Sequence, residues 1–384
     1  MRFVSTGSGD ARPLLALLAL PALLALAACG GASPSGSSTQ EVVIGSVNSV
    51  TGGGALSGIE DTNIIKLAVT DINKTSTKWH FTYSNVDDRS TPATSVASVE
   101  QVLATPNLVG IVGGNLSGDG AAEMPLVVQS GLPVVSSYQN IDSRGANVFS
   151  TLDPQSYFMS AIVNQVLVPK GIKTVGLIWQ DQVALVQAAN GIRTALTSAG
   201  ITLVADQGAP YTTTDLSAQL TKVLAANPAA IAIVPSVAVA GSLVVQLRQR
   251  NYKGLIFGGE SLSLPAFRAA AGDAVAGVLF SAEWDPSIAN AGAQTVIQEY
   301  KTAYPGQPAP DAFGMSAYAA TMMLYGAIEA AGSTDKAKVL AQLTTMKTSG
   351  VLGSNLTFDP TTGFLNIPGI VVQITSSGTM HYQG

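Results

Sequence analysis

The feature that most constrains the fold of this chain is a regular alternation of short β-branched runs with longer, alanine-rich amphipathic stretches. The alternation extends from about residue 41 to residue 280. Neighbouring parallel strands need a long crossover, and an amphipathic helix is the usual one. The pattern therefore predicts an α/β fold, in which right-handed crossovers place helices on both faces of a parallel sheet.

The predicted strands are short apolar runs: Val42–Val47, Trp79–Asn85, Leu108–Val112, Val134–Ser136, Thr174–Trp179, Thr202–Ala205, Ala230–Val234, Leu255–Phe257 and Gly277–Phe280. The predicted helices are the stretches between them: Gly58–Asn73, Pro92–Ala104, Gly118–Ser130, Gln155–Val168, Val183–Ala199, Asp215–Ala226, Ala238–Gln249 and Pro265–Ala271. After residue 287 the pattern changes to long helices and two short extended runs: Ile288–Tyr304, Asp311–Ala331, Asp335–Met346, Leu356–Phe358 and Gly369–Ile374. The chain thus contains two similar βα halves, which begin near residues 41 and 172, and a shared C-terminal part.

The first 40 residues differ in composition from the rest of the chain. Residues 14–28 are apolar, follow two arginines and precede small residues, which is the order of a secretory signal peptide. As a helix this segment would span roughly 22 Å, less than the roughly 30 Å of a membrane core. Because Pro21 also interrupts it, a mature transmembrane helix is the weaker interpretation. Residues 30–40, GGASPSGSSTQ, have the composition of a flexible tether.

Cys29 is the only cysteine of the chain and lies between these two segments. The sequence LAAC at residues 26–29 resembles the bacterial lipobox, in which the cysteine is lipidated and becomes the first residue after cleavage. The resemblance implies a lipoprotein signal peptide at residues 1–28 and a lipidated Cys29 with its tether at residues 29–40. Cys29 is then a membrane anchor. The alternative is that Cys29 is an incidental small residue of an ordinary signal peptide.

The composition excludes several classes of function. Removal of the signal leaves roughly 350 residues, enough for about two domains. With one cysteine, and with His80 and His381 in no ligand spacing, we expect no disulfide, no metal site and no cofactor. Charged residues make up 11%, the net charge is −5, and no basic run follows Arg12, so we expect no nucleic-acid partner. No later apolar run is long enough to span a membrane, so we expect a soluble mature chain.

Open parallel sheets bind ligands beyond the carboxyl ends of their strands, so the loops there are the candidate functional segments. Five loops contain suitable residues: NSVTGGG (48–54), NVDDRS (85–90), GGNLSGDG (113–120), SSYQN (136–140) and GGESLS (258–263). The three glycines at 52–54 do not give the dinucleotide-binding spacing, and a flexible turn is the favoured interpretation. Asp87 and Asp88 could act as an acid–base pair, but a capping or solvated role is favoured.

Ser117 and Glu260 are the strongest candidates for contact with a ligand. Ser117 lies between a strand and a helix, where its hydroxyl and free backbone N–H groups could hold a carboxylate; an ordinary helix cap is the alternative. A hydrolase based on Ser117 lacks both the G-x-S-x-G pattern and an evident histidine base. Glu260 follows an apolar strand and two glycines, and we expect it to project toward the same crevice; a surface position is the alternative. Trp179 and Trp284 each end a strand-like run, where core or rim positions are common.

These loops resemble those of the type I periplasmic solute-binding proteins, in particular the branched-chain amino-acid and amide-binding group that serves ABC importers. The resemblance covers residues 41–384 and rests on segments in the family order: IGSVNSVTG, AVTDIN, DDRSTP, GIVGGNLSG, GLPVVSS, LRQRNYKGLIFGGES, AFGMSAYAA and LTFDPTTG. It implies two Rossmann-like lobes with parallel central sheets, joined by a three-segment hinge. The implied crossings lie near Ser150–Asp153, Ser281–Asp285 and Phe358–Gly363. Lobe 1 would comprise residues 41–152 and 284–359, and lobe 2 residues 153–283 and 360–384.

The resemblance also implies roles for individual residues. Ser117 matches the family serine that binds the ligand carboxylate, and Glu260 matches the acid that receives the ligand ammonium. Tyr138 and Asn140 occupy a loop position that donates further hydrogen bonds, and Phe313 matches an aromatic residue of the pocket. Further residues could line the ligand: Asn115, Asp119, Trp179 and Ser236.

Three positions bear on which ligand is bound. Members that bind leucine-like ligands often carry tyrosine where this chain has Ala184, and Ser236 is a second departure. Asp119 adds a negative charge near the expected carboxylate site. These positions leave the identity of the solute open.

The resemblance implies an extracytoplasmic binding protein and not an enzyme. We expect it to capture a small polar solute, such as an amino acid, amide or carboxylate, by hinge closure and to deliver it to ABC permease subunits. A lipid anchor at Cys29 would hold it at the membrane. The alternatives are a ligand-sensing module for a signalling receptor and a hydrolase that uses Ser117.

Overall fold

The structure is a computed structural model that describes residues 39–137 and 144–382. It contains a five-stranded sheet in the order β2-β1-β3-β4-β5, and all of its strand pairs are parallel. Its strands are β1 (Gln40–Val47), β2 (Trp79–Val86), β3 (Leu108–Gly113), β4 (Val134–Ser136) and β5 (Val148–Ser150). The predicted α/β class is therefore confirmed for this part of the chain.

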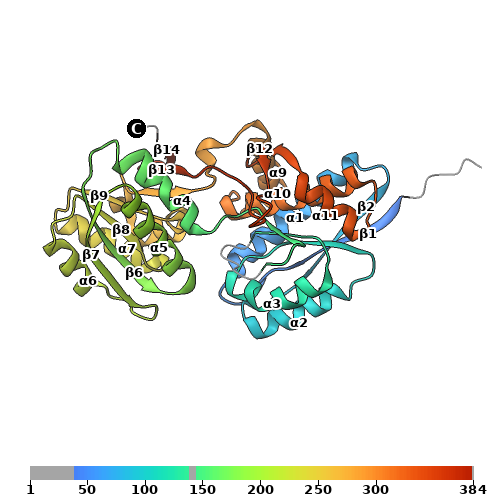
Figure 1. The fold of residues 1–384 in the computed structure, drawn as a ribbon, viewed down its shortest axis with the longest axis horizontal. Coiled ribbons are helices and arrows are strands. Elements are labelled where there is room, and N and C mark those ends of the chain that lie inside the picture. Colours follow the sequence, from blue (N-terminus) through green and yellow to red (C-terminus); the bar gives the residue numbers. More distant parts are fainter. Residues whose placement is uncertain (1–38, 138–143, 383–384) are drawn as a thin grey trace, which may run out of the picture. The chain divides into compact units, whose positions relative to one another are not determined.

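Helices cover both faces of the five-stranded sheet (Figure 1). They are α1 (Ala55–Thr75), α2 (Pro92–Leu103), α3 (Ser117–Ser130), α9 (Ala291–Ala303), α10 (Ala312–Ala331) and α11 (Lys336–Thr345). One core packs α1, α9 and α10 against β1 and β2, and a smaller core packs α2 and α3 on the opposite face. The hairpin β11 (Lys347–Gly350) and β12 (Gly353–Thr357) packs on the first core through Leu356.

The seven-stranded sheet has the order β14-β13-β10-β9-β8-β6-β7. Its strands are β6 (Thr174–Asp181), β7 (Thr202–Pro210), β8 (Ala230–Val234), β9 (Leu255–Gly258), β10 (Leu279–Ala282), β13 (Ile370–Ile374) and β14 (Thr379–His381). The five strands from β6 to β10 pair in parallel, and β13 and β14 add an antiparallel edge. Two cores, one on each face, pack this sheet against α4 (Gln155–Ile162), α5 (Val183–Ser198), α6 (Ser217–Ala225), α7 (Val237–Gln249) and α8 (Pro265–Ala271).

Single residues set several element boundaries. The Thr91 hydroxyl accepts a hydrogen bond from the Thr94 N–H and caps α2. The helix begins at Pro92, as the sequence predicted. The helix predicted from Ile288 begins at Ala291 instead, because the Asn290 side chain caps it there. Helix α4 continues as a π-helical turn at Val163–Leu167.

The segments that join the two sheets are linked by hydrogen bonds. The Ser150 N–H donates to the Gly363 carbonyl, and the Leu365 N–H donates to the Ser150 carbonyl. The sequence did not predict β5 as a strand, although the equally short β4 was predicted. Leu365 and Ile367 pack in the main core of the five-stranded sheet, so the chain leaves this sheet later than the predicted boundary at residue 359.

Candidate solute site

Ser117 is the first residue of α3 and directly follows the loop at the carboxyl end of β3. Its side chain is half-buried, and its hydroxyl makes no hydrogen bond to another described residue. Leu116 at the N-cap gives the helix no side-chain acceptor, so the first N–H groups of α3 remain available beside the Ser117 hydroxyl. This arrangement can hold an anionic group such as a carboxylate.

Asn115 builds the loop next to Ser117. Its Oδ1 accepts from the Ser49 N–H at 2.9 Å, and its Nδ2 donates to the Gly54 carbonyl and the Ser57 hydroxyl, each at 3.1 Å. The side chain predicted as a possible ligand contact is therefore engaged in holding the loop after β1. Tyr138 and Asn140, the other predicted contacts near this edge, lie outside the described residues.

Two acidic side chains, Asp87 and Asp88, also stabilise the loop after β1. Asp87 accepts from Val50 N–H at 3.0 Å and from the Thr51 hydroxyl at 2.6 Å, and Asp88 accepts from the Ser49 hydroxyl. The two carboxylates thus hold the loop after β1, and neither caps α2, whose N-cap is Thr91. Asp119 is buried beside Asp88, and its pKa is raised to about 6 by its burial and by the charge of Asp88.

Glu260 lies directly after β9 and Gly259, at the start of a short 3₁₀ turn, and it is fully buried. The surface position that the sequence left open is therefore wrong. Glu283 follows the neighbouring strand β10 and is also buried, and its Oε1 accepts a hydrogen bond from the Asp153 N–H. Burial, Glu260 and Asp153 together raise the pKa of Glu283 well above its usual range.

Sequence reasoning missed Glu283. The signal that could have identified it is the one that singled out Glu260, namely a carboxylate placed directly after a buried strand. The pairing of β9 with β10, in which Gly258 lies opposite Phe280, brings the two acids to the same edge of the sheet. This edge suits a cationic group.

Two other predicted contacts belong to the seven-stranded sheet. The Trp179 indole N–H donates to Asp206 at 2.8 Å, and the Arg193 guanidinium lies 5.0 Å from the ring centroid. Ser236 ends the loop between β8 and α7, and its N–H donates to the Gln180 side chain at 2.8 Å. The indole N–H of Trp179 is therefore already used within its own sheet.

Phe313 lies in the first turn of α10 and is half-buried. Its N–H donates to Asp311 Oδ1 at 2.8 Å, and the Asp311 N–H donates to Glu60 Oε1 of α1 at 2.9 Å. The first turn of α10, which carries Phe313, is thus hydrogen-bonded to α1.

The family model that describes periplasmic binding proteins matches residues 41–379, which is most of the chain. The chain belongs to the periplasmic binding protein family. This is a family of solute-binding proteins and not of enzymes, which confirms the prediction that the chain is a binding protein. Membership of the family also implies an extracytoplasmic location.

Relatives of this periplasmic binding protein include a curated Leu/Ile/Val-binding protein homolog of Brucella melitensis. The two chains are 28% identical over 260 residues, which are 67% of this chain and 69% of the relative. A branched-chain amino acid transporter substrate-binding protein from Streptococcus pneumoniae, solved with isoleucine, has a TM-score of 0.76 at 21% identity and covers 90% of this chain and 100% of its own. A solute-binding protein of an ABC transporter from Rhodopseudomonas palustris, solved with 3,4-dihydroxybenzoic acid, has a TM-score of 0.77 at 19% identity. The match covers 89% of this chain and 96% of that protein.

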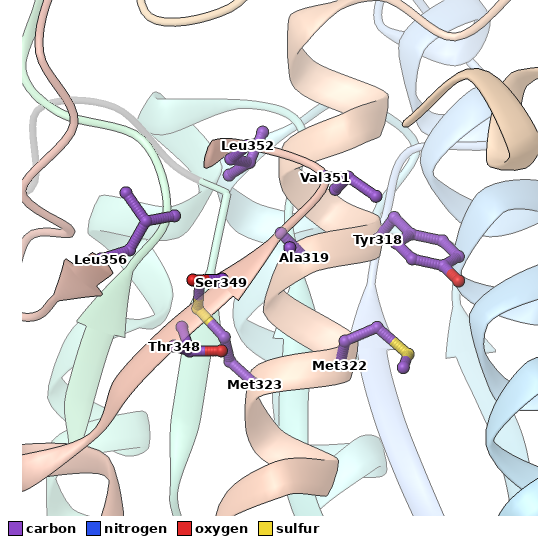
Figure 2. A pocket seen from close by; sticks show the side chains of 10 residues that line it. Tyr318, Ala319, Met322, Met323, Thr348, Ser349, Val351, Leu352 and Leu356 are labelled. Atoms are coloured by element: carbon purple, nitrogen blue, oxygen red, sulfur yellow. The ribbon is translucent and has the colours of Figure 1, made fainter. Parts of the chain in front are cut away.

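A separate cavity of about 220 Å³ in this binding protein lies between α10 and the β11–β12 hairpin. Figure 2 shows Tyr318, Met322 and Met323 of α10 on one side of it and residues of the hairpin on the other. It contains no charged side chain and none of the predicted site residues. It therefore offers no charged side chain that could pair with the carboxylate or ammonium group of an amino acid.

In residues 39–137 and 144–382, no three His, Cys, Asp or Glu side chains are grouped so that they could hold a metal ion. In the same part of the chain, no helix is long and apolar enough to cross a membrane.

Proposed function

We propose that this periplasmic binding protein is the extracytoplasmic receptor of an ABC importer and that its solute is a small amino acid. The observation that carries the proposal is the chemistry of the residues that follow two strands. In the five-stranded sheet, β3 leads to Ser117 and the exposed N–H groups of α3, and in the seven-stranded sheet, β9 leads to the buried Glu260. The first suits a carboxylate and the second an ammonium group.

The relatives support the same class of solute. The Brucella protein is named for leucine, isoleucine and valine, and the Streptococcus structure contains isoleucine. The Rhodopseudomonas relative holds an aromatic acid that has no ammonium group. A buried glutamate at the solute site favours the amino acid, because its carboxylate would repel a second anion and would pair with an ammonium.

We further propose that the two sheets are the cores of two lobes that close on the solute. Lobe 1 would comprise residues 41–152 with the chain from residue 284, and lobe 2 residues 153–283 with the C-terminal strands. Closure would bring the carboxylate and ammonium sites together and strengthen the charged hydrogen bonds, each worth roughly 1.5–3 kcal/mol. A smaller radius of gyration in solution scattering with saturating solute is the expected signature.

We propose that Cys29 carries the lipid anchor, as the lipobox resemblance implies. Cys29→Ala should leave folding unchanged and convert a membrane-associated protein into a released or unprocessed one. Mass spectrometry of the mature N-terminus measures this directly. A wild-type protein recovered without a lipid mass would contradict the proposal.

The first experiment is a thermal-shift screen with L-leucine, L-isoleucine, L-valine and 3,4-dihydroxybenzoate. An amino acid should raise the unfolding temperature and the aromatic acid should not. Calorimetry with the amino acid that binds best then compares wild type with Glu260→Gln, which keeps the shape and removes the charge. Loss of the charged hydrogen bond should weaken binding roughly 10- to 150-fold.

The matched control is Glu100→Gln, because Glu100 is exposed on α2. It should bind as the wild type does. Binding of the aromatic acid in place of every amino acid, or unchanged affinity in Glu260→Gln, would overturn the proposed recognition of an ammonium group.

A further inference from the structure

The N-terminus of α10, which carries Phe313, is capped by acids from two different helices. Asp311 Oδ1 accepts from the N–H groups of Phe313 at 2.8 Å and Gly314 at 3.3 Å. In a capping box, an acidic side chain three residues after the cap returns a hydrogen bond to the cap N–H. Here that position is Gly314, and Glu60 of α1 accepts from the Asp311 N–H instead, at 2.9 Å.

Gly314 makes room for this arrangement. A Cβ atom at this position would lie 2.2 Å from Glu60 Oε1, much closer than two such atoms can approach. The backbone of Gly314 is helical, so no unusual dihedral angle requires glycine there. The glycine therefore serves the close approach of Glu60 to the helix end.

Glu60 and Asp311 are two acidic residues at one helix end, and each affects the pKa of the other. Burial and the charge of Asp311 raise the pKa of Glu60 to about 9, so Glu60 carries a proton at neutral pH. No lysine or arginine contributes to this shift. Asp61 contributes to the shift of Glu60, and Tyr300 of α9 also interacts with Glu60. Tyr83 of β2 interacts with Asp61, and Tyr304 interacts with Tyr300.

We propose that Glu60 is a positioning residue of the solute site: its carboxyl group accepts the Asp311 N–H, completes the cap of α10 and so fixes Phe313. Ionisation of Glu60 at alkaline pH would add a negative charge beside Asp311 and disturb this helix end. The link to solute rests on the proposed function and on the family resemblance, by which Phe313 matches a residue of the pocket. The cap itself is tested without any solute, so a failure of this inference is distinguishable from a failure of the proposed function.

The first test is a double-mutant cycle on packing. Gly314→Ala should lower the unfolding temperature by about 3 °C or more, because its methyl group displaces Glu60. In a Glu60→Ala background the same substitution should not lower the unfolding temperature, since the space is then free and alanine favours a helix. Equal losses in both backgrounds would show that Glu60 and Gly314 are not coupled and would overturn the proposal.

The second test follows Phe313 directly. The protein is labelled with 4-fluorophenylalanine, and the ¹⁹F resonance of Phe313 is assigned through Phe313→Leu. In wild type this resonance should shift with a midpoint near pH 9 as Glu60 loses its proton. In Glu60→Gln, which keeps a hydrogen-bond donor, it should stay constant from pH 6 to pH 10.

Asp61→Asn is the control, because burial raises the pKa of Asp61 to about 8, and its titration could otherwise be mistaken for that of Glu60. The Phe313 titration should persist in this variant. A resonance that does not titrate in wild type, or that titrates equally in Glu60→Gln, would refute the positioning role.

Discussion

Replacing Asp61 by asparagine should stabilise the protein at neutral pH and leave its stability at acidic pH unchanged. Asp61 lies on the buried face of α1 and is 1% exposed, and neither of its carboxyl oxygens has a hydrogen-bond partner among residues 39–137 and 144–382. Burial and the charge of Asp311 raise its pKa from 3.8 to about 8. The folded protein therefore keeps a proton at pH 7 that the unfolded chain releases.

The direction of this pH dependence of stability follows from proton linkage. An acid whose pKa is raised on folding favours the folded state least at high pH, so stability is lost as the pH rises from about 4 to about 8. At pH 7 the free-energy cost of keeping Asp61 protonated is set by the difference between its usual pKa of 3.8 and the pH. This difference corresponds to about 4 kcal/mol. Asparagine has a similar shape and no charge to suppress, so Asp61→Asn should recover most of this free energy at pH 7 and none at pH 4.

The assay is urea unfolding at a series of pH values between 4 and 8, followed by tryptophan fluorescence. Two of the three tryptophans, Trp79 and Trp284, lie in the main core of the five-stranded sheet, so a Trp179→Phe background reports on that core alone. Glu100→Gln on the exposed face of α2 is the control. A gain below about 1 kcal/mol at pH 7, or a gain that is the same at every pH, would refute the reasoning.

Three further predictions concern single contacts. Gly58→Ala should destabilise the protein by about 2–3 kcal/mol, because a Cβ there would lie 1.8 Å from the Ser49 carbonyl oxygen; thermal unfolding that matches wild type would contradict this. Ser117→Ala should weaken amino-acid binding less than about tenfold by calorimetry, since the backbone donors of α3 remain. Asp206→Ala should change the fluorescence of Trp179 while costing less than about 1 kcal/mol of stability, because its ion pair with Arg193 is partly exposed.

The sequence by itself determined the class of fold and most of the elements. Periodicity is a local property, and a run such as Ala230–Val234 bounded by polar turns predicts a buried strand without knowledge of its neighbours. It also determined that Ser117 lies between a strand and a helix, because a strand, a glycine turn and an amphipathic helix succeed one another there. The family resemblance, carried by loops in a fixed order, agrees with the family to which the chain belongs.

Only the tertiary structure decided which polar groups share an environment. The sequence places Glu283 directly after a buried run, but only the pairing of β9 with β10 brings it to Glu260. Glu60 and Asp311 are about 250 residues apart in sequence, yet they form one helix cap because α1 and α10 pack on the same face of the sheet. Such contacts depend on the packing of distant segments, and no local periodicity encodes them.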